Sequence, residues 1–329
     1  MMNEVYPKVS VCMITYNHEH FIGQAIESAL MQKTSFDFEI VIGEDCSTDR
    51  TRDVVEHYKA ENPDRIRLLL NKENKGTVRN FADTLKACKG QYVALLEGDD
   101  YWTSSDKLEK QVDFLDSHPD YAICYHAAHL VDREGKLKVI LPFTQYKKPT
   151  SAILDLFIND SFMATCSTMF RNKLFGDFPP VFFASNMMCD WSLNVLNAQY
   201  GYIGYLDEVM SVYRSNSSPS AFTANRGLLM AEEHIKIKKA FDEYFDCRYH
   251  DHIQRLIARY YYEMAVDSIK LGYFSQALTY LRQSLKSQIR PDLIRRGFLR
   301  EIPQALLSFG LRSYFPGTYK FLRQQVNRR

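Results

Sequence analysis

The chain has 329 residues, and its 46% hydrophobic and 25% charged residues are ordinary for a globular protein with a sizeable core. Its 41 Lys and Arg residues nearly balance its 40 Asp and Glu residues, so no overall field attracts it to nucleic acid. This balance excludes nucleic acid as a partner, and the length predicts one large domain with a smaller appendage.

The cysteines and the apolar runs bear on the location of the protein. The seven cysteines stand singly, without the close-paired spacing of a structural zinc site or a redox dithiol. Residues 1–17 contain no basic stretch followed by a continuous apolar segment, which a secretory signal would have. No apolar run approaches the about 20 residues that a spanning helix requires. We therefore expect a cytoplasmic protein with reduced cysteines, or one that lies peripherally at the inner face of the membrane.

Short apolar runs alternate with segments of helical periodicity through the first hundred residues. Polar side chains follow the apolar runs, as expected where buried parallel strands open into loops. Strands are predicted at residues 9–14, 38–43, 66–70 and 91–100, and helices at residues 21–31, 53–62 and 78–88. This order predicts an α/β fold with an open, largely parallel sheet, which binds ligands beyond the carboxyl ends of its strands.

The pattern changes along the rest of the chain. Residues 121–132 and 161–171 look like further strands, which predicts a mixed, partly antiparallel second half of the sheet. After about residue 225 the pattern is helical, and residues 259–286 resemble one tetratricopeptide-like hairpin with Gly272 at its turn. This region could be a helical extension that packs on the larger domain, or part of a peptide-binding repeat array.

An acidic run, Glu97-Gly98-Asp99-Asp100, directly follows the apolar residues 92–96. Carboxylates held at a strand end inside a ligand-binding crevice are costly without a cation. One or two carboxylates plus a diphosphate are the oxygen ligands that Mg²⁺ or Mn²⁺ takes. A triplet of this kind alone is also typical of a solvated turn, but its position after a buried strand favours a metal site.

Four segments in the first hundred residues resemble, in order and spacing, the donor half of the family 2 inverting glycosyltransferases with the GT-A fold. They are Val9-Ser10-Val11 with Thr15-Tyr16-Asn17, residues 44–51 (EDCSTDRT), Asn74-Lys75-Gly76 with Arg79-Asn80, and residues 96–100 (LEGDD). The resemblance covers about the first 215 residues.

This resemblance implies a Rossmann-like mixed sheet that is flanked by helices. The implied GT-A glycosyltransferase domain spans residues 1–225, with a donor half at about 1–105 and an acceptor half at about 106–225. A helical C-terminal extension would follow at residues 226–329.

A nucleotide-sugar donor is also implied, with roles for the matching residues. Thr15, Tyr16 and Asp45 would form the pocket for the base and ribose, and Asp99 would hold the Mn²⁺ or Mg²⁺ ion. The implied donor-binding set is Thr15, Tyr16, Asn17, Glu44, Asp45, Arg79, Glu97, Gly98 and Arg214.

Some positions depart from the family pattern. Glu44 replaces the more usual Asp, Cys46 the usual Gly, and Glu97 the first Asp of the triplet. Arg214 fits the basic residue that reaches the diphosphate, but the His often found a few residues later is absent. These departures leave the identity of the nucleotide open, and UDP is the favoured one.

Asp190 begins a helix-like segment beside Trp191. From the residues alone, its carboxylate could cap the helix by accepting hydrogen bonds from the first free amides. In the family, an acid followed by an aromatic residue here is the general base, so the resemblance implies that Asp190 removes the proton of an acceptor hydroxyl. That oxygen would attack the anomeric carbon opposite the departing nucleoside diphosphate and invert its configuration, while the metal neutralises the leaving group.

The resemblance implies transfer of a single sugar. The Q-x-x-R-W signature of processive synthases is absent from the sequence. The implied acceptor is a glycan or a lipid-linked intermediate of bacterial surface polysaccharide. A basic, aromatic segment from Arg290 onward could contact an anionic membrane peripherally, or form a solvated helix over the larger domain.

Two rival functions stay open. A nucleotidyltransferase would need a Gly-rich, basic phosphate loop after the first strand, and residues 15–21 offer none. A non-catalytic glycan-binding or scaffold protein would use its helical tail, and it would not need both Asp99 and Asp190.

Overall fold

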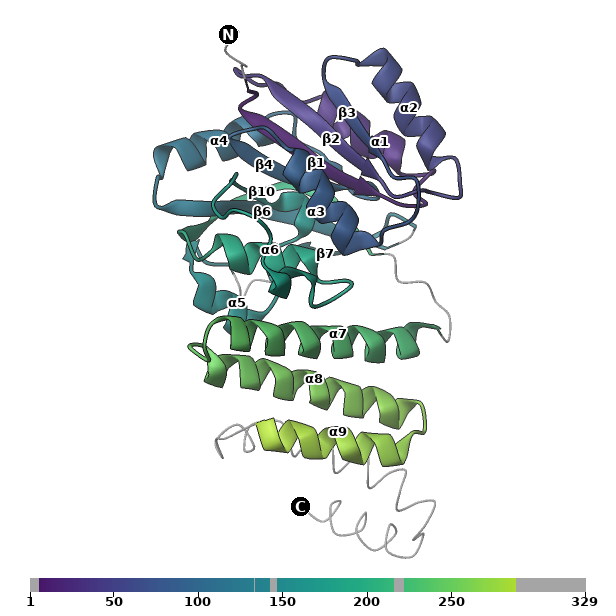
Figure 1. Cartoon of the computed structure of the whole chain (residues 1–329), viewed down its shortest axis with the longest axis vertical. Coiled ribbons are helices and arrows are strands. Elements are labelled where there is room, and N and C mark those ends of the chain that lie inside the picture. The colour runs from purple at the N-terminus through teal and green to yellow at the C-terminus, as the bar shows by residue number, and fades with distance from the viewer. Residues whose placement is uncertain (1–5, 133, 143–146, 216–221, 288–329) are drawn as a thin grey trace, which may run out of the picture. The chain divides into compact units, whose positions relative to one another are not determined.

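The computed structural model describes residues 6–132, 134–142, 147–215 and 222–287 (Figure 1). Residue contacts divide the chain into two compact units, Met1–Thr223 with Lys236–Tyr249 and Ala224–Ile235 with His250–Arg329. Helix α7, Phe222–Tyr244, contributes its last part to the first unit and most of its remainder to the second. The domain boundary expected near residue 225 stays a prediction.

Within the described residues, the first unit contains one sheet in the order β3-β2-β1-β4-β9-β6-β10-β5, with β7 paired to β6 and β8 to β10. Strands β3, β2, β1 and β4 pair in parallel, whereas β9 lies antiparallel to both β4 and β6. The predicted mixed α/β sheet is thereby confirmed. The strands are β1 Val9–Thr15, β2 Phe38–Glu44, β3 Ile66–Leu70, β4 Tyr92–Glu97, β5 Tyr101–Trp102, β6 Tyr121–Val131, β7 Leu137–Leu141, β8 Thr150–Ser151, β9 Met169–Arg171 and β10 Tyr202–Arg214.

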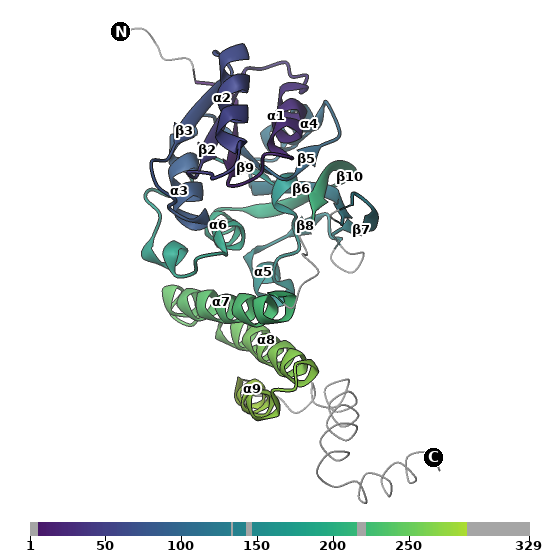
Figure 2. The same ribbon diagram turned by 90° about the vertical axis from the view of Figure 1, so that its right-hand side faces the viewer.

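Helices cover both faces of this sheet, with α1, α2 and α4 on one face and α3 and α6 on the other (Figures 1 and 2). The apolar residues of α1 show why it packs there, because Ile22, Ala25, Ile26 and Ala29 are all buried at helical spacing. The helices are α1 Ile22–Leu30, α2 Thr51–Glu61, α3 Thr77–Ala87, α4 Lys107–Ser117, α5 Ile153–Asn159 and α6 Cys189–Asn197, with 3₁₀ turns at η2 Thr165–Ser167 and η3 Pro180–Phe183.

The register of the parallel strands brings their carboxyl ends to one edge of the sheet. Thr15 at the end of β1 pairs with Glu44 at the end of β2. On the other side of β1, Ile14 pairs with Glu97 at the end of β4. The polar segments that follow these three strands therefore start side by side.

The core of the first unit lies between the sheet and its helices. Every residue of β1 is buried, as is usual for an interior parallel strand. Val11 and Met13 of β1 and Ile40 and Ile42 of β2 belong to one continuous hydrophobic cluster. Burial of each such side chain stabilises the fold by about 1.5–3 kcal/mol, so the strand ends have a rigid support.

The strand expected at residues 161–171 is shorter than predicted. Only Met169–Arg171 forms a strand, whereas Thr165–Ser167 forms a 3₁₀ turn. The hydroxyls of Ser167 and Thr168 donate hydrogen bonds to the Ala164 carbonyl at 2.7 and 3.3 Å. Such local bonds from side chain to backbone compete with strand pairing, which explains the difference.

Two helices of the second unit form the predicted hairpin. Helix α8, His250–Lys270, and helix α9, Phe274–Ser287, are joined at Gly272. Gly272 has a φ of 82°, a conformation that glycine adopts without strain. Ser284 Oγ of α9 donates a hydrogen bond to the Ala258 carbonyl of α8 at 2.7 Å, which ties the helices together.

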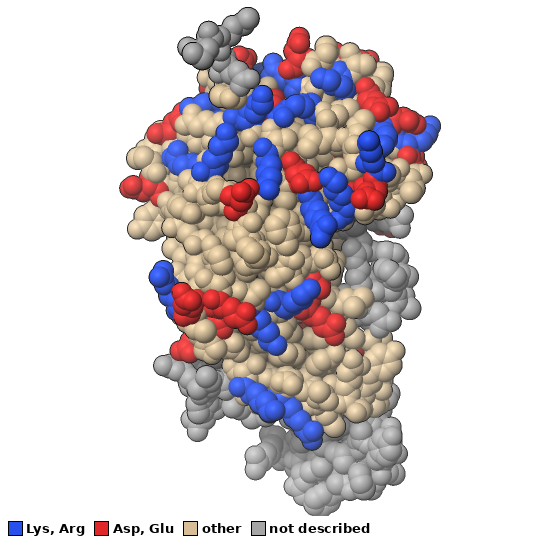
Figure 3. Space-filling model, in the orientation of Figure 1, with Lys and Arg blue, Asp and Glu red and all other residues tan. Residues whose placement is uncertain are grey.

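The surface of the first unit carries both signs of charge. Figure 3 shows acidic and basic side chains interspersed on one face, in keeping with the near balance of 41 and 40 such residues in the sequence. None of the helices in the described ranges combines the length and apolar character needed to span a bilayer. The basic segment from Arg290, with its predicted membrane contact, lies outside the described residues.

Candidate active site

Asn17, a predicted donor residue, joins the loops that follow β1 and β2. Its side-chain oxygen accepts a hydrogen bond from the Thr48 amide at 2.8 Å, and its own amide donates to Ser47 Oγ at 3.0 Å. Its φ of 54° lies in the left-handed region, which asparagine tolerates better than most residues. Asn17 therefore shapes the loop in which its neighbour Tyr16 is left exposed.

Glu44 is the last residue of β2 and Asp45 follows it, and both are buried with their carboxylates bonded inside the protein. Glu44 forms an ion pair with Arg52. Asp45 accepts hydrogen bonds from the amides of Lys75 and Gly76, each at 2.9 Å. These bonds fix the loop before α3 against the end of β2. The two residues thus give the site its frame, and their contact with a donor stays a prediction.

Arg79 was also predicted to contact the donor. It lies in the first turn of α3, directly after the loop that Asp45 holds, and its side chain is exposed. The structure therefore places Arg79 next to the frame of the site, on the solvent side.

Gly98, Thr15 and His18 meet closely where β1 and β4 end. Thr15 Oγ1 lies 3.3 Å from His18 Nδ1. A Cβ on Gly98 would come within 2.7 Å of Thr15 Oγ1 and 3.0 Å of His18 Nδ1, so a larger residue would displace both side chains. Burial lowers the pKa of His18, and the charges of Asp99 and Asp49 oppose that shift. His18, which is not in the implied donor-binding set, therefore faces the acidic run.

The carboxylates of residues 97–100 and of Asp190 come together at this edge. Burial raises the pKa of Glu97 well above its usual value, and the charges of Asp99, Asp100 and Asp190 raise it further. Burial and the charge of Asp99 likewise raise the pKa of Asp100. The pKa of the Tyr213 hydroxyl is raised by burial and by all four carboxylates. Strands β4 and β10 and helix α6 therefore bring these groups within electrostatic reach of one another.

Asp190 lies in the first turn of α6, whose N-cap position falls on Met188. Asp190 is therefore not the cap residue, and Thr165 Oγ1 donates a long hydrogen bond of 3.4 Å to its Oδ2. Burial raises the pKa of Asp190, while the hydrogen bond from the Trp191 amide and the charge of Lys238 oppose the rise. A carboxylate whose basicity is increased by burial is suited to accept a proton.

Arg214 adjoins this group at the end of β10. Its amide donates a hydrogen bond to Asp100 Oδ1 at 2.8 Å, and its guanidinium donates to the Asp99 carbonyl. The guanidinium also stacks over the rings of Phe21 and Tyr101, 5.0 and 4.6 Å from their centroids. The structure thus brings the predicted Arg214 beside the predicted metal ligand Asp99.

The end of β4 has the chemistry that a divalent cation requires. Desolvation and further negative charges raise the pKa values of Glu97 and Asp100, and a bound cation would relieve this repulsion. Asp99 and Glu97 are half-buried, whereas Asp100 is buried. A half-buried carboxylate can share an ion with the phosphates of a ligand. The residues present therefore fit the predicted Mg²⁺ or Mn²⁺.

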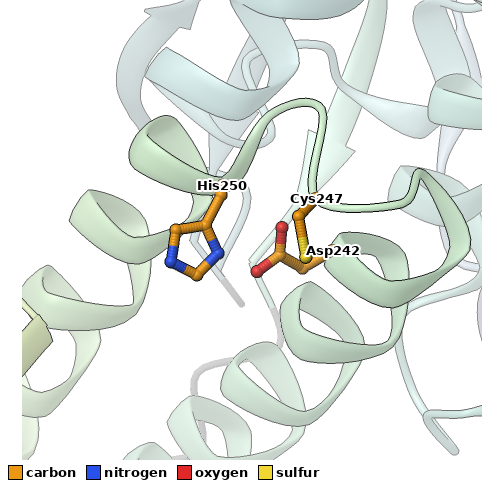
Figure 4. Close-up of side chains that lie close together, drawn as sticks. All are labelled: Asp242, Cys247 and His250. Carbon is orange, nitrogen blue, oxygen red and sulfur yellow. The ribbon is translucent and has the colours of Figure 1, made fainter.

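A second set of metal-binding side-chain types lies near the turn after α7. Asp242 and Cys247 belong to the first unit, and His250 is the first residue of α8 in the second (Figure 4). We assign no site to this group, because its members are divided between the two units.

Tyr213 and Lys238 join the site without having been predicted. Tyr213 directly precedes the predicted site residue Arg214 at the end of β10. That position was the sequence signal by which Tyr213 could have been identified. Lys238 lies in α7, and nothing in its local sequence marks it as a neighbour of Asp190.

Comparisons of sequence with known proteins identify relatives. The model of glycosyl transferase family 2 matches residues 10–178. An uncharacterized protein of Mycobacterium tuberculosis is 36% identical over 222 residues, which cover 66% of this chain and 62% of that protein. The chain thus matches less than two thirds of the length of such relatives. The Escherichia coli UDP-Glc:alpha-D-GlcNAc-diphosphoundecaprenol beta-1,3-glucosyltransferase WfaP is 37% identical over 109 residues, 33% of this chain and 41% of that protein.

Solved structures share the fold. S. aureus TarS in complex with UDP has a TM-score of 0.51 at 19% identity, over 86% of this chain and 93% of that chain. The mannosyltransferase PcManGT from Pyrobaculum calidifontis, in complex with GDP-Man and Mn²⁺, has a TM-score of 0.51 at 16% identity, over 87% and 88% of the two chains. At these identities the likeness shows the fold alone, and it confirms the predicted GT-A fold.

Proposed function

The chain belongs to glycosyl transferase family 2, and we propose that it is an inverting, metal-dependent enzyme that transfers a single sugar from a nucleotide-sugar to an acceptor hydroxyl. The observation that carries the proposal is the grouping of Asp190 with the carboxylates of residues 97–100. A base and a metal-binding carboxylate must act on the same sugar, so they must lie close together. Here they come from α6 and β4, which are far apart in the sequence.

Asp190 is the proposed general base. It accepts the proton of the acceptor hydroxyl as that oxygen bonds to the anomeric carbon. The bond between the anomeric carbon and the diphosphate oxygen breaks on the opposite side, so the configuration inverts and the nucleoside diphosphate leaves. The Trp191 amide and the start of α6 favour the ionised carboxylate, while burial preserves its basicity.

Asp99 and Arg214 are the proposed partners of the leaving group. Asp99 would hold Mn²⁺ or Mg²⁺, and such an ion supplies positive charge for the departing diphosphate. Arg214 adds a fixed positive charge of its own, because the Asp99 carbonyl and two aromatic rings hold its guanidinium in place. Mn²⁺ in PcManGT supports a divalent ion in this fold.

A UDP-sugar is the proposed donor. UDP is bound in TarS and UDP-Glc is named as the donor of WfaP, whereas GDP-Man is bound in PcManGT. Thr15, Tyr16 and Asp45 are proposed to surround the base and ribose, with Arg79 beside the base or diphosphate and Glu97 and Gly98 toward the ribose. The loop frame built by Asn17 and Glu44 supports a rigid pocket at this edge.

The proposed acceptor is a glycan or a lipid-linked intermediate of bacterial surface polysaccharide. The name of WfaP gives a sugar on a lipid diphosphate as its acceptor.

A panel of UDP- and GDP-sugars tests this function. The full chain is incubated with each donor, Mn²⁺ and a lipid-linked or soluble glycan acceptor, and the release of nucleoside diphosphate is measured. We expect release with one donor, its loss on chelation, and its loss in Asp190→Asn. Asp113→Asn, an exposed aspartate of α4, is the matched control and should retain the rate.

Other results would support the rivals. Release of pyrophosphate from a nucleoside triphosphate and a sugar phosphate would indicate a nucleotidyltransferase. Glycan binding without turnover of any donor, unchanged in Asp190→Asn, would indicate a binding protein.

A further inference from the structure

Lys238 is buried beside the residue that follows the proposed base, although it comes from α7. Its Nζ lies 3.3 Å from the centroid of the Trp191 ring. The same Nζ forms an ion pair with Asp160 Oδ1 at 2.7 Å. The Lys238 side chain is 0% exposed and that of Asp160 9%, so water screens this pair little. Each of these residues belongs to the first unit.

Aromatic packing fixes this part of α7 against α5 and α6. The Phe241 ring packs at a right angle to Trp191, with the centroids 5.3 Å apart. Phe157 of α5 contacts Trp191 from its own helix, at a centroid distance of 5.8 Å. Asp160 directly follows α5 and has a φ of 62°. The cation on Lys238 therefore has a defined place rather than a mobile one.

A second buried lysine shows what Asp160 contributes. Lys107 stacks on the other tryptophan, Trp102, with its Nζ 3.8 Å from the ring centroid. In the part of the chain that the structure describes, the Lys107 ammonium has no hydrogen-bond partner, and burial lowers its pKa to about 7. Stacking on a tryptophan alone thus does not hold a buried lysine fully charged. Lys238 differs because a carboxylate pairs with it.

We propose that Lys238 is a positioning residue for the base: held by Asp160 and Trp191, it keeps a fixed positive charge beside Asp190 and maintains that carboxylate in the form that accepts a proton. The inference rests on the proposed function of Asp190. It assigns part of the catalytic arrangement to α7, outside residues 10–178 that match the family model.

The groups that face Asp190 come from several elements. Glu97 of β4, Cys189 of α6 and Tyr213 of β10 are coupled to its charge. The charge of Lys238 lowers the pKa of Asp190, whereas burial raises it. Loss of the Lys238 charge should therefore move the protonation of Asp190 to higher pH.

Two variants that break the same ion pair test the proposal. Lys238→Met removes the cation, so the acid limb of the pH profile of kcat should move to higher pH. At a pH below this limb, the rate of Lys238→Met should be about tenfold lower than the wild-type rate at the same pH for each pH unit by which the limb has moved. Asp160→Asn leaves Lys238 stacked on Trp191, as Lys107 is stacked on Trp102. Lys107, whose pKa is lowered to about 7, is still protonated in the acid range where the limb of an aspartate lies, so the limb of Asp160→Asn should stay in place or move to lower pH. Lys238→Arg keeps the charge and should restore the wild-type limb.

A merely structural ion pair predicts a different pattern. Lys238→Met and Asp160→Asn would then lower the rate at all pH values alike, or change the limb in the same direction, and either result overturns the proposal. Thermal unfolding of each variant identifies any loss of fold. If Lys238→Met does not fold, the comparison of Lys238→Arg with Asp160→Asn still tests the proposal. A limb that moves to higher pH in Asp160→Asn contradicts it.

Failure of this inference and failure of the proposed function are distinguishable. If the wild type releases no nucleoside diphosphate from any donor, the proposed function is wrong. If the wild type is active and Asp190→Asn is not, but Lys238→Met has the wild-type pH profile, only the role of Lys238 is wrong. Lys110→Met serves as the control, because Lys110 forms its ion pair with Glu208 on the exposed surface.

Discussion

The carboxylates at the end of β2 and those at the end of β4 lie at the same edge of the sheet, but their surroundings differ. Glu44 is paired with Arg52, and Asp45 accepts hydrogen bonds from backbone amides. Glu97 and Asp100 instead lie among further carboxylates, and their pKa values are raised by burial and by that charge.

This difference separates residues that build the site from residues available for chemistry. Bonds made within the protein satisfy a buried carboxylate and lock a loop. Buried carboxylates that repel one another are unfavourable unless a ligand compensates them, so such groups are typical of functional sites. The group after β4, together with Asp190, therefore marks the reacting end of the site.

The largest expected effect is that of Asp190→Asn. Removal of a general base costs about 10²–10⁴ in rate, and kcat should fall by that range while the donor KM changes little. Burial raises the pKa of Asp190 above the usual value of an aspartate, about 3.9. As the pH decreases, wild-type activity should therefore begin to fall at a higher pH than an ordinary aspartate would give. Steady-state kinetics over pH measure both effects, and an active Asp190→Asn variant would contradict them.

Asp99→Asn should act next most strongly, through the metal. Loss of an outer-shell partner alone costs about 10–100-fold in metal affinity, and loss of a ligand should cost at least as much. The Mn²⁺ concentration for half-maximal rate should therefore rise at least tenfold. Titration of the rate with Mn²⁺ measures this change, and an unchanged titration curve would exclude Asp99 as the ligand.

Asp45→Asn and Asp100→Asn test the comparison directly, because both residues are buried aspartates, 2% and 1% exposed. Asp45→Asn should destabilise the fold by about 1–3 kcal/mol, since hydrogen bonds to a buried acceptor are weakened. Asp100→Asn should instead stabilise the metal-free protein at neutral pH. Urea unfolding in the presence of a chelator measures both changes.

The sign for Asp100 follows from its raised pKa. The folded protein binds a proton more tightly than the unfolded chain, so wild-type stability is lost as pH rises through the folded pKa. Asparagine avoids that loss, by about 1.4 kcal/mol for each pH unit that separates the folded and unfolded pKa values. The advantage of Asp100→Asn should vanish at low pH, and equal destabilisation by both variants would refute the contrast.

The donor side of this fold was predictable from the sequence because its signals are local. Each strand from residues 9 to 97 is a short apolar run that ends in polar residues, and the helices between them have apolar residues at helical spacing. Parallel pairing then brings the strand ends together without further information. The predicted positions of Thr15, Gly98 and Asp99 at one edge follow from that rule.

Contacts between residues that are distant in sequence were less predictable. Lys238 of α7 pairs with Asp160, which follows α5, and neither residue has a local pattern that marks the other. The hydrogen bonds from the loop at residues 74–76 to the Asp45 carboxylate could not be predicted either. A motif gives the type of a residue but not the hydrogen-bond partner of each of its oxygens. Packing decided both outcomes.

Gly98→Ala should have the smallest of these effects, and it tests how closely the two groups of loops meet. The added Cβ would lie 2.7 Å from Thr15 Oγ1, 2.9 Å from Thr15 Cβ and 3.0 Å from His18 Nδ1. Thr15 Cβ is fixed to the backbone, so the end of β1 must shift together with the His18 ring. Overpacking costs about 1–3 kcal/mol of stability, and the displaced side chains should raise the donor KM roughly fivefold.

Gly176→Ala is the matched control, because a Cβ there meets no atom within 4 Å. It should leave the donor KM unchanged, so a rise confined to Gly98→Ala would locate the donor against Thr15 and His18. Equal KM values for the two variants would mean that the donor does not bind where β1 and β4 end. The side chains of the β1 loop would then belong to the frame alone, as Glu44 does.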